Sequence, residues 1–135
     1  MLDRFETATR LPAQDLDRAR AFYAEKLGLT PSEERPGGLL YRCGGTRFAL
    51  FTSGGRPSGE HTQMAWTVDD LEAVVAELRG RGVTFEHVEV PGLRTVGGIA
   101  EVDGNYPSAG TGERAAWFRD SEGNLLGIGE PTLDD

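Results

Sequence analysis

The chain has 135 residues, the size of one domain. Its 22 acidic residues outnumber its 14 basic ones, giving a net charge of −8, and duplex binding usually needs a basic face, so we expect no nucleic-acid partner. The single cysteine excludes an internal disulfide. Because no run approaches the ~20 apolar residues of a membrane span and the N-terminus does not match a signal peptide, we expect a cytoplasmic protein without a membrane partner. The basic residues are almost all arginine, which is typical of a GC-rich bacterial genome.

In the first half, a short extended segment precedes a helix. Asp15 is a suitable N-cap and Gly28 a suitable residue after the last turn. Residues 38–42 and 47–52 are then predicted as two strands of a hairpin, because Gly44-Gly45 lies between them. The apolar face of the helix is predicted from helical spacing: Leu16, Ala19, Phe22, Tyr23 and Leu27.

The second half repeats this order. Another extended segment leads into a helix that ends near Gly80, and Asp69 with Glu72 is the expected N-terminal capping pair. Residues 83–90 are expected as a strand. The long loop 91–114 is expected to contain a short strand at 99–102. The last two strands are predicted at 115–119 and 124–128, around an Asp-Ser-Glu-Gly turn.

Together the halves predict one domain, residues 1–135, made of modules at about 5–52 and 61–130 with a polar linker at 53–60. Each module has the order strand, helix, strand, strand, strand. One helix covers one face of such a sheet, so the other face has to meet the partner module or stay open as a cleft. We therefore predict an α+β fold in which two βαβββ modules form a curved mixed sheet around a cleft.

Three segments carry a family pattern. Residues 11–28 read LPAQDLDRARAFYAEKLG, residues 68–82 echo them, and residues 118–126 read FRDSEGNLL, close to Phe-x-Asp-Pro-Asp-Gly-Asn with serine replacing proline. With the element order, these segments make the chain resemble the vicinal-oxygen-chelate superfamily of glyoxalases, bleomycin resistance proteins and ring-cleaving dioxygenases. The resemblance implies the fold and a homodimer, but not the reaction, because this fold hosts unrelated chemistries.

The resemblance also indicates where a metal would be held. In metal-dependent members the ligands stand at the positions of Ala8, Gln63 and Gly127, and near Leu50. Only Gln63 has a donor atom there, whereas a catalytic zinc or non-haem iron takes about three protein ligands. We therefore predict no metal site and no cofactor.

Alternation along a strand assigns the faces of the segment around Gln63. Small or polar residues are expected on the cleft side: His61, Gln63, Ala65 and Thr67. Apolar residues are expected under the helix: Met64, Trp66 and Val68. Small residues at Ala8, Ala65 and Gly127 would then leave room for a ligand where relatives hold an ion.

The candidate catalytic residues are His61 and Glu101, each with the alternative of a solvated surface residue. The candidate ligand-binding residues are polar or aromatic: Arg10, Tyr41, Gln63, Tyr106, Trp117 and Arg119. For Gln63 the alternative is an amide bonded to the backbone. For Trp117 it is core packing, and for Tyr106 it is packing on its own loop. His87 is expected on a half-exposed strand without a role.

Two functions remain open. The first is a binding protein of the sequestration or resistance type, which holds a small, partly planar organic molecule in the cleft, and the acidic balance favours a cationic one. The second is a metal-free lyase, isomerase or cyclase, in which His61, Gln63, Arg10 and Glu101 supply acid–base and polarising groups. A third possible function is that of a metal-dependent glyoxalase or ring-cleaving dioxygenase, but this chain has too few metal ligands for it.

Overall fold

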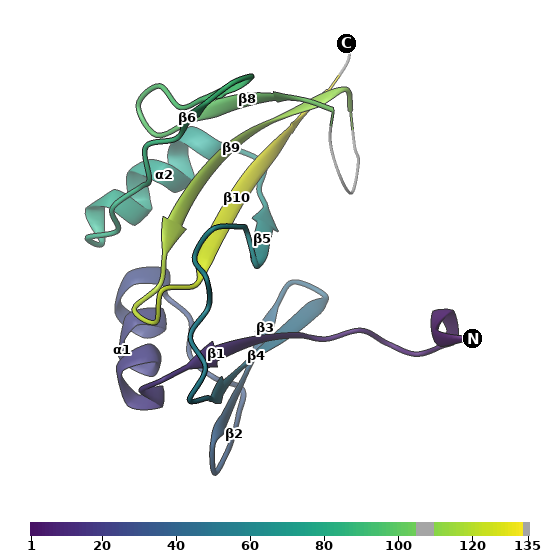
Figure 1. Cartoon of the computed structure of the whole chain (residues 1–135), viewed down its shortest axis with the longest axis vertical. Helices are drawn as coiled ribbons and strands as arrows, with labels where there is room; N and C mark the ends of the chain where they lie inside the picture. Colours follow the sequence, from purple (N-terminus) through teal and green to yellow (C-terminus); the bar gives the residue numbers. More distant parts are fainter. Residues whose placement is uncertain (105–109, 134–135) are drawn as a thin grey trace.

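The computed structural model describes residues 1–104 and 110–133, which form two modules (Figure 1). A short 3-10 turn, Leu2–Arg4, precedes the first module. The elements of that module are β1 (Thr9–Ala13), α1 (Leu16–Leu27), β2 (Glu33–Arg35), β3 (Gly38–Cys43) and β4 (Thr46–Thr52). They form a four-stranded sheet in the order β1-β4-β3-β2, with β1 parallel to β4.

The second module repeats this topology. Its elements are β5 (Met64–Thr67), α2 (Leu71–Gly80), β6 (Glu89–Val90), β7 (Leu93–Arg94), β8 (Ala100–Asp103), β9 (Gly112–Arg119) and β10 (Leu125–Thr132). The sheet order is β5-β10-β9-β8, with β5 parallel to β10, and β6 and β7 form a separate hairpin. The predicted α+β fold of two βαβββ-like modules is confirmed. Within the described residues, neither helix is long and apolar enough to cross a bilayer.

Both helices begin at an aspartate that caps them. Asp15 accepts a hydrogen bond from the Arg18 backbone N–H at 3.0 Å, and Gly28 follows α1 with a left-handed φ of 68°. In α2 the predicted cap is wrong by one residue. Asp70, rather than Asp69, accepts from the Ala73 backbone N–H at 3.1 Å, so the two helices start at equivalent positions of the repeat.

The strand predicted at 83–90 is mostly absent. Phe85 makes only an isolated bridge to Phe118, and regular pairing begins at β6. The cause is the buried side chain of Thr95, whose Oγ1 accepts from the Val88 backbone N–H at 2.9 Å. This contact turns the chain into the β6–β7 hairpin, which the sequence analysis did not predict. The sequence pattern did not indicate the position of β2 either.

Apolar side chains on one face of each sheet form the core. Leu126 and Ile128 are buried, as expected, and Trp66 packs against the same core while Ala65 and Thr67 are exposed. The ring centroids of Phe48 and Trp66 lie 6.1 Å apart, which joins the modules through their helix-covered faces. Among the described residues, no helix covers the opposite face of either sheet (Figure 1).

The turn between β9 and β10 connects the second module to α1 (Figure 1). The buried carboxylate of Asp120 accepts from the Tyr23 hydroxyl at 2.7 Å and from the Asn124 side-chain amide at 2.8 Å. It also accepts from the backbone N–H groups of Glu122 at 2.9 Å and Asn124 at 3.0 Å. The Asp-Ser-Glu-Gly-Asn segment is therefore a structural clamp between the modules.

Glu122 strengthens this clamp from the same turn. Its buried carboxylate accepts from Arg18 Nε at 2.8 Å, from the Asp15 backbone N–H at 2.9 Å and from the Ser121 hydroxyl at 2.8 Å. Burial raises the pKa of Glu122, but these hydrogen bonds and the Arg18 charge outweigh it. They hold the pKa at about 2, below its ordinary value of 4.5.

Acid is therefore expected to weaken the fold through Glu122. A carboxyl with a depressed pKa stabilises the folded state above its ordinary pKa, and this stabilisation is lost as the pH falls towards about 2. The loss should be about 2 to 3 kcal/mol. Denaturant unfolding at pH values from 7 to 2 should show this loss. In Glu122→Gln, the free energy of unfolding should depend less on pH over this range. The exposed control Glu77→Gln should keep the wild-type slope. An unchanged slope in Glu122→Gln would contradict the assignment.

Candidate functional site

A cavity of about 420 Å³ lies on the open face of the second sheet. We call it the sheet cavity. Small residues form its floor: Ala65, Ala115, Gly127 and Gly129. Leu93, Val102, Glu113 and Trp117 are among its other lining residues. Because the floor residues are so small, the sheet itself remains accessible to a ligand at this place.

The indole of Trp117 lies over Gly127. The two residues are direct partners across β9 and β10, and a Cβ atom at position 127 would lie 3.3 Å from Trp117 Cδ1. Any larger side chain at this position would have to push the indole aside. Trp117 is half-buried and lines the cavity rather than the main core.

A second pocket of about 540 Å³ adjoins the sheet cavity and shares Thr62, Leu93 and Trp117 with it. We call it the histidine pocket. Its lining includes both histidines and an ion pair: His61, His87, Glu86 and Arg119. The structure thus brings together three predicted site residues, His61, Trp117 and Arg119.

His87 reaches the histidine pocket because of the turn at Thr95. Its Nδ1 lies 3.2 Å from Thr95 Oγ1, and its Nε2 lies 3.5 Å from Glu89. The sequence analysis gave His87 no role, because it expected a regular strand there. The only local signal was a second histidine close to a glycine-rich loop.

The polar groups of the histidine pocket are weakly organised for acid–base catalysis. His61 is exposed, with Nδ1 3.4 Å from the Ser58 hydroxyl, and Arg119 Nε donates to Glu86. Catalytic histidines are typically oriented by a buried carboxylate. Among the described residues, neither imidazole has such a partner.

Gln63 lies at the edge of β5 and its amide is occupied. Its Nε2 donates to Asn124 Oδ1 at 3.0 Å, and its Oε1 accepts from the Leu125 backbone N–H at 3.3 Å. Asn124 in turn donates to the Pro12 carbonyl at 3.0 Å. Of the two alternatives for Gln63, the structure shows the amide bonded within the protein.

Tyr41 does not line either cavity, and its expected place in the cleft wall is wrong. It is fully buried, with its ring stacked on Phe48 at 5.0 Å. The alternation of β3 turns residues 39 and 41 towards the core rather than towards the open face. Burial raises the pKa of Tyr41 to about 12.

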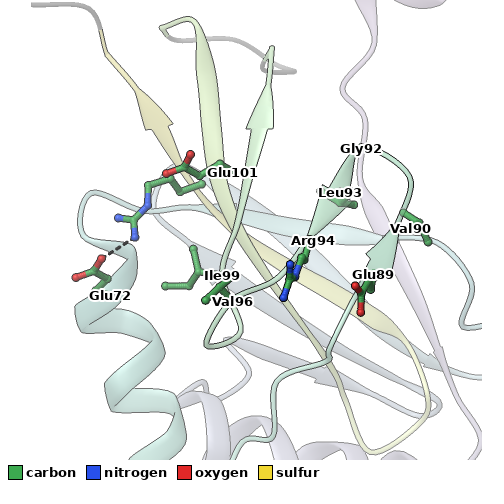
Figure 2. A pocket seen from close by; sticks show the side chains of 10 residues that line it. Glu72, Glu89, Val90, Gly92, Leu93, Arg94, Val96, Ile99 and Glu101 are labelled. Carbon is green, nitrogen blue, oxygen red and sulfur yellow. Dashed lines mark hydrogen bonds and ion pairs between the residues drawn. The ribbon is translucent and has the colours of Figure 1, made fainter.

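Arg10 and Glu101 lie apart from the histidine pocket. Arg10 is exposed on β1 of the first module. Glu101 lines a separate pocket of about 720 Å³ between α2, the β6–β7 hairpin and β8, shown in Figure 2. In that pocket Arg114 donates to Glu72 at 2.6 Å. Tyr106 lies outside the described residues, so its role stays a prediction.

The two modules do not share the open-face cavities within one chain. The sheet cavity and the histidine pocket are lined by the linker and the second module alone. The groove that does touch both modules, about 450 Å³, is mostly apolar and lies beside the C-terminal half of α1 and α2. The expected cleft between the halves therefore corresponds here to an open face of the second sheet.

The residues at the family's metal positions do not fit an ion. Ala8 and Gly127 have no side-chain donor, the amide of Gln63 is occupied by Asn124 and Leu125, and an indole covers position 127. Over the described ranges 1–104 and 110–133, no three His, Cys, Asp or Glu side chains are grouped to hold a metal.

Comparison with known proteins gives the family. The model of the Glyoxalase/Bleomycin resistance protein/Dioxygenase superfamily matches residues 4–128. No curated protein sequence matches.

Solved structures of the same fold include the lactoylglutathione lyase of Agrobacterium tumefaciens, at 22% identity over 94% of this chain and 93% of that one, with a TM-score of 0.62. The bleomycin resistance determinant of transposon Tn5 is 20% identical over 95% and 98%, with a TM-score of 0.63. The antibiotic-binding protein TnmS3 of a Streptomyces species is 22% identical over 96% and 98%, with a TM-score of 0.59. The match over residues 4–128 shows that this chain belongs to the glyoxalase/bleomycin resistance protein/dioxygenase superfamily.

Proposed function

We propose that the protein binds a small, partly planar organic molecule in the sheet cavity without a metal, as a sequestration or resistance protein. One observation carries the proposal: at Gly127, where relatives place a metal-binding carboxylate, the indole of Trp117 covers a floor of small residues. The cavity volume of about 420 Å³ falls within the range of small-molecule sites. An indole face stacks well on planar rings.

Two of the similar structures support this ligand class. One is a bleomycin resistance determinant and another an antibiotic-binding protein. The net charge of −8 favours cationic ligands over anionic ones through long-range attraction. The arginine-rich composition supports a bacterial origin.

The histidine pocket supports a second candidate, a metal-free lyase, isomerase or cyclase. His61 and His87 both line a pocket that continues into the sheet cavity at Trp117, and an imidazole can serve as a general acid or base. Turnover that falls by orders of magnitude in His61→Ala, with ligand affinity kept, would indicate the enzyme. A binding protein would show stoichiometric affinity alone.

The open face of the first sheet supports a homodimer. Phe51 is 36% exposed there and pairs with Pro12 of β1. An exposed apolar sheet face is stabilised when a second layer packs on it. Light scattering should give twice the mass of the chain. A monomer at high concentration would contradict this part of the proposal.

Thermal unfolding tests the proposed function with probes of different charge. The panel is proflavine, anthraquinone sulfonate and bleomycin, each with EDTA and with Zn²⁺ or Mn²⁺. At 100-fold excess over Kd, a ligand stabilises the folded state by about 2.7 kcal/mol, a shift of roughly 8 °C. We expect such a shift with a planar probe, equal in EDTA and in metal. Stabilisation that requires a divalent ion would contradict the proposal.

A further inference from the structure

The carboxylate of Glu113 lines the sheet cavity and has no partner among the described residues. It is the one ionisable side chain among the described residues that line the cavity. Its neighbour Arg114 belongs to the other face of β9, where it pairs with Glu72 and Glu130. Within the described part of the chain, no donor or cation contacts the Glu113 side chain, so its charge is available to a ligand.

The absence of a side chain at Gly129 lets Glu113 lie along the cavity floor. Glu113 stands opposite Pro131 in the register of β9 and β10. A Cβ atom at Gly129 would nevertheless lie only 2.9 Å from the Glu113 carboxylate. The carboxylate therefore leans about two residues along β10, towards Trp117.

The carboxylate and the indole thus mark two ends of one floor. The indole covers Gly127 and the carboxylate covers Gly129, and two residues along a strand span about 7 Å. The small side chains of Ala115 and Ala65 leave the space beside the indole and the carboxylate unfilled. A ligand that stacks on the indole can reach the carboxylate only through an arm of about this length.

The environment of Glu113 favours a cation over a neutral group. Among the described residues no hydrogen bond or cation offsets the partial burial of its carboxylate, and this burial raises its pKa. An ammonium group would supply a charge-assisted hydrogen bond, roughly twice as strong as a neutral one. A hydroxyl of the same size would leave the carboxylate charge uncompensated.

We propose that Glu113 selects ligands with a protonated amine on an arm of about 7 Å from a planar ring. The proposal rests on the proposed function, because the ring has to bind against Trp117. Its distinct content is the chemical class of the ligand, an aryl-alkylamine or a larger molecule that contains this unit.

Calorimetric titration with naphthylbutylamine and naphthylbutanol tests the proposal. The two probes share the ring and the arm and differ in the terminal charge. We expect the amine to bind about tenfold more tightly than the alcohol to the wild-type protein. Glu113→Gln should remove this preference and leave the alcohol affinity within about twofold. Glu25→Gln, the same change on the exposed side of α1, should keep the preference.

The outcomes separate the two proposals. Equal binding of both probes, or a preference that survives in a folded Glu113→Gln variant, would overturn the role of Glu113 and leave the proposed function intact. Failure of both probes to bind would count against both. If Glu113→Gln lowers the melting temperature, Glu113→Asp gives a second reading. It keeps the charge but shortens the reach, so it should restore the preference only in part.

Discussion

Replacing Asp120 with alanine is expected to lower the free energy of unfolding by about 4 kcal/mol. The carboxylate is buried and accepts four hydrogen bonds, from the Tyr23 hydroxyl, two backbone N–H groups and the Asn124 amide. Alanine would leave these donors without acceptors, and each buried unsatisfied group costs more than the bond was worth. Denaturant unfolding, followed by circular dichroism, measures the effect.

Two variants calibrate this result. Tyr23→Phe removes one of the four bonds and should cost about 1 kcal/mol. Asp69→Ala changes an exposed aspartate with no hydrogen bond to the described residues and should stay within about 0.5 kcal/mol of the wild type. An Asp120→Ala variant no less stable than Tyr23→Phe would mean that the turn does not clamp the modules.

Replacing Trp117 with alanine should weaken binding of a planar ligand about 30-fold or more. Truncating a central aromatic contact typically costs 2 kcal/mol or more, which corresponds to this factor. The free energy of unfolding should fall by less than this, because Trp117 is only half-buried on an open face. Calorimetric titration with the probe that gives the largest thermal shift measures the change.

Trp66 provides the matched control. It borders the sheet cavity, but its ring packs in the core, 6.1 Å from the Phe48 ring and 6.4 Å from the Phe118 ring. Trp66→Phe should keep the affinity for the planar ligand, although it also removes an indole ring. Unchanged affinity in Trp117→Ala would show that the ligand binds elsewhere, with the apolar groove between the modules as the next place to examine.

Local signals in the sequence predicted much of the fold. The two helices, the Asp15 cap of α1 and the glycine after it depend on neighbouring residues, so they could be inferred without the tertiary structure. The cap of α2 was predicted one residue too early, because two aspartates stand side by side there. The predicted alternation is confirmed from Met64 to Thr67, where Ala65 and Thr67 are exposed and the residues between them pack on the core. It fails one step earlier, where Thr62 rather than Gln63 lines the cavities. Repetition of the Asp-Leu-acid segment then fixed the order of the modules.

Non-local contacts account for the misses. The β6–β7 hairpin depends on the side chain of Thr95 reaching back to Val88, which no local pattern indicates. Tyr41 was a candidate ligand-binding residue whose facing the sequence did not determine. Apolar residues lie on both faces of β3, Leu39 and Tyr41 on one and Leu40 on the other, so alternation alone did not choose between the faces.

Glu113 was missed for a different reason. The sequence analysis placed it in a loop ending at residue 114, whereas β9 begins at Gly112. Because β9 begins at Gly112, one face of the strand carries Glu113, Ala115 and Trp117. Gly127 and Gly129 lie on the neighbouring strand β10. The paired glycines were a usable signal, because two residues without side chains on one face leave room for long ones opposite.

The most direct test of the central claim is a fluorescence titration of the Trp66→Phe variant, in which Trp117 is the only tryptophan. Proflavine and naphthylbutylamine are added in the presence of EDTA, and again with Zn²⁺. The account predicts saturable one-to-one quenching of Trp117 by at least one probe, with the same Kd in both buffers. Quenching that appears only with Zn²⁺, or thermal stabilisation by a probe that leaves Trp117 emission unchanged, would contradict it.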